Sequence, residues 1–258
     1  MRLKSKTFLV IGGALCAFGA IFCAIILAIG QFDFMKVISV EKYEDKVYTL
    51  PAGALTALNL DAQNQRVVFQ PAASSDIVIR YREFASDTYT FEQQGASLNV
   101  TYRCDQKWYQ SLVQGMFGGI ARASQSITVE VPPQYAGLLN ARTTNASLTA
   151  DAVEAPEADF TTQSGSVRLE NSRFAARVSV RTTNAGIRVE QLASPDIRLS
   201  STNGSIKGTI AGSQQDYSIV TNTTNGSASP SSVINKQAPG QLNATTSNSS
   251  ITLTFTGA

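Results

Sequence analysis

The sequence predicts one N-terminal membrane-spanning helix followed by an all-β ectodomain, built as a parallel β-solenoid of two-strand repeats. Three observations predict this fold. A single uncharged apolar run lies near the N-terminus, apolar and polar residues alternate over most of the remaining chain, and one turn motif recurs through the second half. The turn motif returns after about 20 residues, which is at the short end of the periods typical of solenoids and arrays.

The apolar run extends from Phe8 to Gly30 and contains 23 residues without a charge. At about 1.5 Å per residue, a helix of this length crosses the roughly 30 Å hydrocarbon layer of a bilayer. Three basic residues precede the run, namely Arg2, Lys4 and Lys6. By the positive-inside rule we expect residues 1–7 in the cytoplasm, residues 8–30 in the lipid bilayer of the cell membrane and the rest of the chain outside the cytoplasm.

Two other interpretations of the run are a cleaved signal peptide and a lipoprotein signal. A cleaved signal peptide has a shorter apolar region before a small-residue cleavage site, and Ala28-Ile29-Gly30 imitates such a site. A lipoprotein needs a small residue before a cysteine, but Leu15 precedes Cys16 and Phe22 precedes Cys23. A retained single-pass anchor therefore fits best.

Small residues recur at every fourth position of the run and form one stripe on a helix: Gly12, Cys16, Ala20, Ala24 and Ala28. Such stripes allow transmembrane helices to approach one another closely. Self-association through this stripe is one interpretation. The other is that small residues are simply common in membrane spans.

A charged stalk is expected over residues 31–50, and the β-repeat ectodomain over residues 51–258. In the first half of the ectodomain, β-branched and aromatic residues alternate with polar ones, which is typical of half-buried strands. The strand segments are ALTALNLDA, RVVFQ, DIVIRYR, TYTFEQ, SLNVTYR and SITVEV. Turn signals separate them, and those around Asn64 and Gly95 are interpreted as degenerate repeat units.

A non-repeat insertion at about residues 104–124 interrupts the alternation. Its large apolar residues fall on one helical face, although three glycines weaken any helix there. One interpretation is a short helix or loop packed over the β structure. The other is an apolar flap that contacts a membrane surface or a partner, with these contact residues: Trp108, Tyr109, Met116 and Phe117.

The second half of the chain is self-similar. Each unit has a strand ending in Ser or Thr, then Asn or Ser followed by Gly, Ala or Ser, then a second strand. The turns recur every 19 to 22 residues, at Asn145, Gly165, Asn184, Gly204, Gly226 and Asn248. Two short strands cannot bury an apolar row alone, so we expect the units to stack about 4.8 Å apart as parallel strands. An antiparallel sandwich or barrel is the alternative, which the constant turn spacing disfavours.

Composition limits the function. The absence of histidine excludes triad hydrolases and histidine-ligated metal sites. A net charge of only +2 does not indicate the basic surface that nucleic-acid binding requires. Cys104 is the lone cysteine after the apolar run, so the ectodomain cannot form an internal disulfide. The sequence therefore predicts no enzyme, no cofactor and no metal, with a β-helical carbohydrate-active enzyme as a weaker alternative.

The anchor, the Val131-Pro132 element and the [ST]-x-[NS]-[GA]-[SG]-[IV] units together resemble the family called "putative adhesin", domain of unknown function 4097. The resemblance covers roughly residues 55–255. It implies a surface-exposed β-solenoid of the Gram-positive type, and it carries over no catalytic residue. Many members place Asp after the turn glycine, where this sequence has other residues.

Two functional hypotheses follow. In the first, the chain is a membrane-anchored surface module that binds a glycan or another envelope protein in an adhesin-like manner. In the second, it is an envelope-stress regulatory or structural subunit that acts through its anchor, with the repeats as a spacer.

Overall fold

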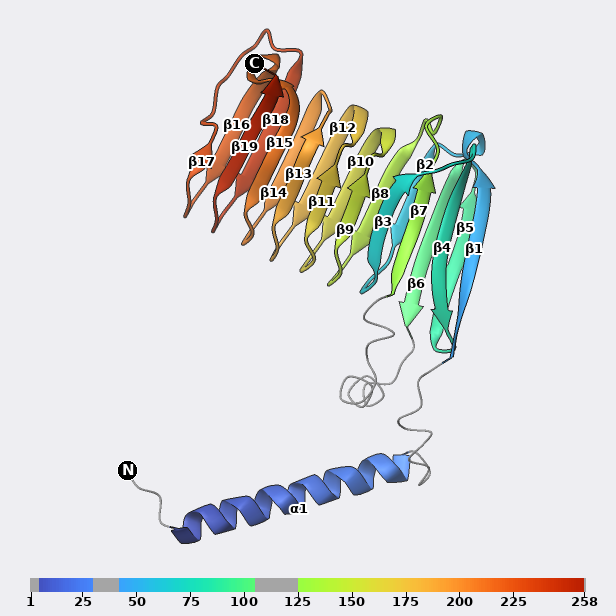
Figure 1. Ribbon diagram of the computed structural model, residues 1–258, viewed down its shortest axis with the longest axis vertical. Helices are drawn as coiled ribbons and strands as arrows, with labels where there is room; N and C mark the ends of the chain where they lie inside the picture. The colour runs from blue at the N-terminus through green and yellow to red at the C-terminus, as the bar shows by residue number, and fades with distance from the viewer. Residues whose placement is uncertain (1–4, 30–41, 105–124, 258) are drawn as a thin grey trace. The chain divides into compact units, whose positions relative to one another are not determined.

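The computed structural model describes residues 5–29, 42–104 and 125–257. The chain divides into two units, one of residues 1–42 with 105–124 and the other of residues 43–104 with 125–258. The first unit contains the helix α1 (Ser5–Ile29), and the second contains every described strand (Figure 1). The residues of the apolar contact flap, Trp108, Tyr109, Met116 and Phe117, lie outside the described residues, as do Arg2, Lys4 and Gly30.

Helix α1 presents large apolar side chains to the outside along its described part. Leu15 is 67% exposed and Phe18 is 71% exposed. At Gly12, within the small-residue stripe, an added Cβ would meet no heavy atom within 4 Å. Among the described residues, however, no helix combines the length and the hydropathy that crossing a membrane requires.

The β unit consists of two sheets that enclose one core (Figure 1). We call the ten-stranded sheet A and the nine-stranded sheet B. Sheet A has the order β1-β4-β7-β3-β9-β11-β13-β15-β19-β17, and sheet B has the order β16-β18-β14-β12-β10-β8-β2-β6-β5. The strands of sheet A are β1 (Tyr43–Pro51), β3 (Arg66–Pro71), β4 (Asp76–Phe84), β7 (Ser126–Val131), β9 (Leu148–Asp151), β11 (Val167–Glu170), β13 (Ile187–Leu192), β15 (Ile206–Ser213), β17 (Ala228–Ser229) and β19 (Ile251–Gly257). Those of sheet B are β2 (Ala57–Asp61), β5 (Asp87–Gln94), β6 (Ser97–Cys104), β8 (Leu138–Thr143), β10 (Glu154–Thr162), β12 (Arg173–Thr182), β14 (Asp196–Ser201), β16 (Tyr217–Thr223) and β18 (Gly240–Thr246). Two short 3-10 turns complete the described elements, η1 (Ala52–Ala54) and η2 (Gln214–Asp216).

From β8 to β15 the chain alternates between the sheets, and each strand pairs in parallel with the next strand of its own sheet. We use the word coil for one strand of sheet B, the turn that follows it and the next strand of sheet A. The turn within a coil is called its corner. In sheet A, Val167 lies opposite Ile187, and Ile187 lies opposite Ile206. The predicted parallel stacking is thus confirmed for these coils, and the antiparallel alternative is wrong for them.

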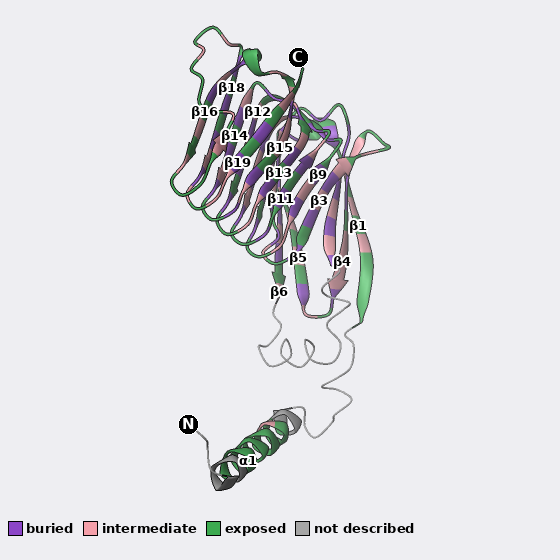
Figure 2. Cartoon of the chain, turned by 60° about the vertical axis from the view of Figure 1, so that its left-hand side comes forward, coloured by how far each residue is buried: buried purple, intermediate pink, exposed green. Residues whose placement is uncertain are grey.

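The core lies between the sheets and consists of side chains that alternate with polar ones along each strand (Figure 2). Stacking of identical coils places like residues next to one another, which is why rows of Ile, Val and Leu are buried from end to end. Each fully buried residue of this size contributes roughly 1.5–3 kcal/mol relative to exposure. Phe69 and Phe160 add a stacked ring pair with centroids 5.2 Å apart.

The N-terminal end of the unit differs from the sequence-based expectation. Residues 43–50 were expected in the stalk, but they form most of β1, which pairs antiparallel with β4. The charged residues of β1 hid its alternation, because an edge strand exposes more polar side chains than an inner one. Gly95 was interpreted as part of a degenerate repeat unit, but it lies in the tight hairpin between β5 and β6 and has a positive φ of 61°. The unit around Asn64 is a coil, formed by β2 and β3.

The coils are not stacked in chain order at either end. The C-terminal coil, β18 and β19, lies between the coil of β14 and β15 and the coil of β16 and β17. At the other end, the coil of β2 and β3 lies between the coil of β6 and β7 and the coil of β8 and β9. The last coil in the chain is therefore inserted between the two coils that precede it, whereas the first coil in the chain is flanked by the two that follow it.

The chain between β6 and β7, which includes the non-repeat insertion, is longer than the turns of the other coils, and we call it the enlarged corner. Asp61 and Arg66 of the β2–β3 coil pair with Thr101 and Ser126 of the β6–β7 coil. The first two residues are five positions apart in the chain, whereas their partners are 25 apart. Cys104 closes β6, and the extra residues after it lie outside the described part of the chain.

Candidate functional site

The corners predicted from sequence come together on one edge of the β unit. Their exposed side chains form hydrogen bonds from coil to coil, and we call this row the corner ladder. Asn203 Nδ2 donates to Asn184 Oδ1 over 2.9 Å, and Asn248 Nδ2 donates to Asn203 Oδ1 over 2.7 Å. The ladder contains Asn64, Asn145, Ser164, Asn184, Asn203, Asn248 and Asn225.

Beneath the ladder, a buried Ser or Thr begins five of the corners, namely Thr143, Thr162, Thr182, Ser201 and Thr246. Thr182 Oγ1 donates to the carbonyl of Gly165 over 3.1 Å, and Thr246 Oγ1 donates to the carbonyl of Gly204 over 3.0 Å. These bonds satisfy corner carbonyls that water cannot reach. The recurring Thr-Thr-Asn motif is thus explained by stacking, and the predicted turn residues have structural roles.

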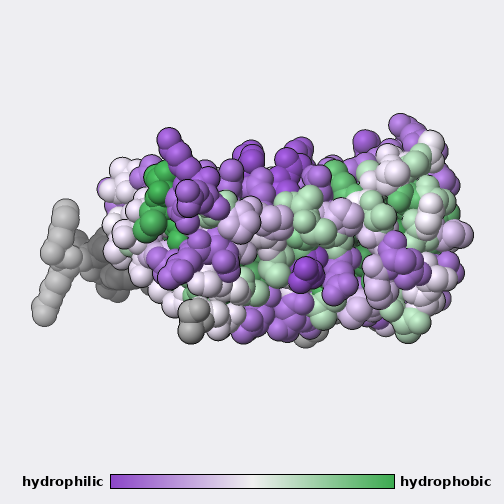
Figure 3. All heavy atoms as spheres, turned by 90° about the horizontal axis from the view of Figure 1, so that it is seen from above, coloured by the Kyte–Doolittle hydropathy of each residue, from purple (hydrophilic) through white to green (hydrophobic). Residues whose placement is uncertain are grey.

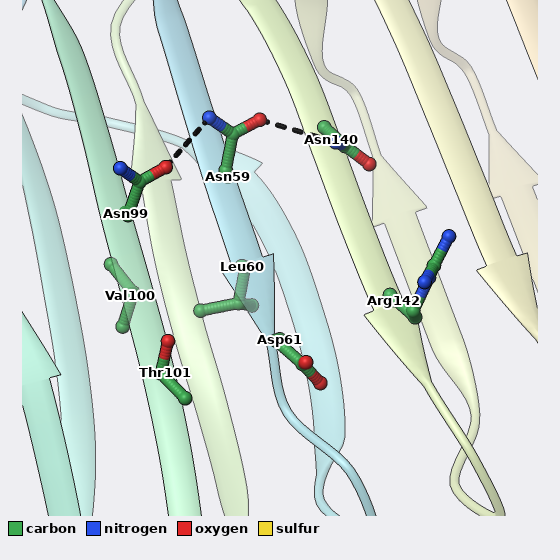
Figure 4. A pocket seen from close by; sticks show the side chains of 8 residues that line it. All are labelled: Asn59, Leu60, Asp61, Asn99, Val100, Thr101, Asn140 and Arg142. Atoms are coloured by element: carbon green, nitrogen blue, oxygen red, sulfur yellow. Dashed lines mark hydrogen bonds between the residues drawn. The ribbon is translucent and has the colours of Figure 1, made fainter.

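A shallow depression of about 410 Å3 lies on the outer face of sheet B, where β6, β2 and β8 are neighbours (Figure 4). Its centre is a row of three half-buried amides. Asn59 Nδ2 donates to Asn99 Oδ1 over 2.9 Å, and Asn140 Nδ2 donates to Asn59 Oδ1 over 3.1 Å. The lining residues are Asn59, Leu60, Asp61, Asn99, Val100, Thr101, Asn140 and Arg142.

Two opposite charges lie in the row next to the amide row and form no ion pair with each other in the described structure. Asp61 and Arg142 are exposed and face each other in register on β2 and β8. Figure 4 shows the Arg142 side chain extending away from Asp61. Elsewhere on this face, Glu157 and Arg177 are also in register and are joined by a 2.8 Å ion pair.

The remaining outer surface is polar over much of the view in Figure 3. On sheet A, charges pair along single strands, as in the 3.0 Å contact of Arg168 Nη1 with Glu170 Oε1. Exposed ion pairs of this kind contribute little to stability, up to about 1 kcal/mol. They do place opposite charges side by side on this face, in contrast to the basic surface typical of nucleic-acid binding.

A second polar cluster is enclosed between the sheets near the enlarged corner. Asp87 is 7% exposed, and its carboxylate accepts hydrogen bonds from Tyr102 Oη at 3.1 Å and Gln125 Nε2 at 2.9 Å. Tyr89 Oη donates to the side chain of Gln65. Burial raises the pKa of Tyr89 and of Tyr102 well above the ordinary value of a tyrosine. These hydrogen bonds join β5, β6 and the residue before β7, so the cluster holds this end of the core together.

The raised tyrosine pKa values predict a loss of stability in alkali. The folded state holds the phenolic proton more tightly than the unfolded state, whose tyrosines titrate near pH 10. The stabilisation is therefore complete below pH 10 and falls as the pH rises above it, by about 1.4 kcal/mol per pH unit for each buried tyrosine. Urea unfolding between pH 9 and 12 should show this slope. Tyr102→Phe should reduce it by one tyrosine.

Neither the corner ladder nor the depression contains a set of catalytic groups among its described residues. Among the described residues, no group of three or more Cys, Asp or Glu side chains could hold a metal ion. The depression contains one carboxylate and no nucleophile paired with a base, which acid–base or covalent catalysis would require. What it can do is form directional hydrogen bonds.

No sequence motif marks the residues of the depression as a site. Asn59 is 40 positions from Asn99 and 81 positions from Asn140, so no local motif joins them. The available signal was that each Asn occupies an outward position of an alternating strand. The pairing of β2 with both β6 and β8 brings them together.

These features define a two-sheet β-repeat protein with a polar outer surface and a hydrogen-bonding depression on one sheet. The chain belongs to the Toastrack DUF4097 family, whose model matches residues 55–256. The resemblance noted from the sequence is thereby confirmed.

Two solved structures are similar to the chain. A "putative cell adhesion protein" from Clostridium sporogenes is 9% identical, with a TM-score of 0.51, and the match covers 83% of this chain and 100% of that chain. A "putative adhesin" from Parabacteroides merdae is 11% identical, with a TM-score of 0.31, and the match covers 82% and 96% of the two chains. At this identity the first likeness shows a shared fold. No curated protein matches the chain.

Proposed function

We propose that the chain is a membrane-anchored, extracytoplasmic β-repeat protein that binds partners at the cell surface in an adhesin-like, non-catalytic manner. The observation that carries the proposal is the depression on sheet B, where pre-formed amide hydrogen bonds leave further donors and acceptors exposed. The fold shared with a protein called "putative cell adhesion protein" supports the same function.

The anchor in this proposal is the run from Phe8 to Gly30, with the N-terminus in the cytoplasm. Its support is the uncharged sequence, the three basic residues before it, and the exposed apolar side chains of α1. A surface of this kind favours lipid over water, because each buried methylene contributes about 0.8 kcal/mol.

Membrane fractionation tests the anchor. The double variant Leu15→Lys, Phe18→Lys should move the chain from the carbonate-resistant membrane fraction to the soluble fraction, because charges inside a bilayer cost at least about 2.5 kcal/mol each. Ile234→Lys is the matched control, since Ile234 is also apolar and 66% exposed but lies in the β unit. A wild-type chain that alkaline carbonate extracts completely would contradict the anchor.

Binding is tested with the full chain in lipid nanodiscs, added to isolated cell envelopes and to whole cells of the source organism. Saturable retention that empty nanodiscs do not show is expected. Absence of retention on every envelope fraction would reject the surface-binding function.

The small-residue stripe favours the second candidate, a regulatory or structural subunit that acts through its anchor. Permuting Gly12, Ala20 and Ala24 with neighbouring Leu and Ile residues would then abolish function, while exchange of the β unit would be tolerated. The opposite result supports the surface-binding module.

A further inference from the structure

We propose that the depression on the outer face of sheet B binds neutral, hydroxyl-rich saccharides. The inference rests on the proposed surface-binding function and names the ligand class of that site. It depends on three properties of the depression, which are the fixed orientation of its amides, the opposite roles of its two charged groups, and the continuation of its polar rows along the sheet.

The amide row is oriented and incompletely used. Each primary amide has two N–H donors and two acceptor lone pairs. The two hydrogen bonds of the row use one donor of Asn59, one donor of Asn140 and one lone pair each of Asn99 and Asn59. Most of the hydrogen-bonding capacity of the three amides therefore remains, in side chains that are already held in place. Such pre-organisation reduces the entropy lost when a ligand binds.

The charged groups select hydroxyl groups over ions. Asp61 is an acceptor only, and Arg142 is a donor only. An anionic ligand would be attracted by Arg142 and repelled by Asp61. A cationic ligand would be attracted by Asp61 and repelled by Arg142. A hydroxyl group is both donor and acceptor, so a polyhydroxylated neutral ligand satisfies both residues and the amide row next to them. The two formal charges cancel, which is consistent with a neutral ligand.

The polar rows continue beyond the depression in the direction of stacking. Asp159 follows Asn140 in register on β10, and Thr161 follows Arg142. Arg181 follows Thr161 on β12. A linear saccharide lying across these strands would meet a polar group at each strand, about 4.8 Å apart. No aromatic ring lines the depression, so affinity depends on hydrogen bonds and is expected to be modest.

The test uses the full chain in nanodiscs and three oligosaccharides of equal length, titrated by ligand-observed NMR. They are neutral N-acetylchitohexaose, basic chitosan hexamer and acidic hexagalacturonate, with neutral glucan, mannan and galactan hexamers as further probes. At least one neutral hexamer should bind more tightly than both charged ones. Asn59→Ala, which removes both bonds of the amide row, should weaken that binding about tenfold.

Charge variants provide a readout that a structural role would not move. Asp61→Asn should shift the preference toward hexagalacturonate, and Arg142→Gln should shift it toward the chitosan hexamer. Asn184→Ala is the matched control, because Asn184 is in a similar amide row in the corner ladder, on another edge. The affinity of Asn184→Ala for the neutral hexamer should equal that of the wild type. Circular dichroism should show that all variants are folded.

The proposal is overturned if no neutral hexamer binds at millimolar concentration, if a charged hexamer binds best to the wild type, or if Asn59→Ala and Asn184→Ala have the same effect. Envelope retention separates this failure from failure of the surface-binding function. If Asn59→Ala is retained on envelopes as well as the wild type, the surface-binding function stands and the depression is not its site.

Discussion

Alanine in place of Gly165 or Gly204 is expected to destabilise the β unit by about 3 kcal/mol or more. A Cβ at Gly165 would lie 1.8 Å from the carbonyl oxygen of Ala146, and one at Gly204 would lie 1.9 Å from that of Ala185. Both oxygens belong to the backbone of the neighbouring corner. Relief of the clash would require the coils to separate, which breaks hydrogen bonds along the corner ladder and beneath it.

Urea unfolding followed by circular dichroism measures the effect as a change in the midpoint at constant slope. Gly53→Ala is the control, because an added Cβ there meets no heavy atom within 4 Å. It should change stability by less than about 0.5 kcal/mol. Equal stability of Gly53→Ala and Gly165→Ala would show that the corners are not closely packed.

The same contacts reveal a pattern in the order of the coils. From β8 toward the C-terminal end of the stack, the residues at the centre of the corners are Ala146, Gly165, Ala185, Gly204, Ser249 and Gly226. Glycine therefore alternates with a residue that has a Cβ. In chain order the alternation fails, because Gly226 follows Gly204 directly. A Cβ at Gly226 would lie 2.1 Å from the carbonyl oxygen of Ser249, which is the neighbour that the non-sequential order provides.

The parallel stacking and the corners could be predicted because both depend on local periodicity. Val167 and Leu169 alternate with polar residues, and Asn or Ser with a small residue marks each turn. Coil order could not be predicted in this way, since every coil presents similar edges to its neighbours and a swapped order has the same local pattern. The glycine alternation is the one sequence signal that distinguishes the two orders.

The depression could not be predicted from the sequence, for a related reason. Asn59, Asn99 and Asn140 are ordinary outward positions of three strands, and their meaning depends on the long-range pairing of those strands. The antiparallel end strands were also missed. Lys46 on β1 forms an ion pair with Glu83 on β4, and such charged edge residues resemble a solvated linker when the chain is considered alone.

Removal of residues 240–258 is expected to destabilise more of the chain than loss of a terminal coil would. The deleted coil lies inside the stack, so its loss breaks the pairing with β14 and β15 on one side and with β16 and β17 on the other. It also removes Leu242, Ile251 and Leu253, each at most 2% exposed. At roughly 1.5–3 kcal/mol for each side chain, the loss should be at least about 5 kcal/mol.

Hydrogen exchange on the intact chain distinguishes the observed order from a sequential one without relying on a truncated protein. Amides of β18 have a strand on either side and should exchange more slowly than those of β16, which pairs with β18 and is otherwise covered by the bridge of Ile219 with Val233. In a sequential stack, β18 would be the outermost strand of sheet B and would exchange first. Faster exchange in β18 than in β16 would therefore contradict the inserted coil. Slower exchange in β18 would show that the last part of the chain is held by both of its neighbours.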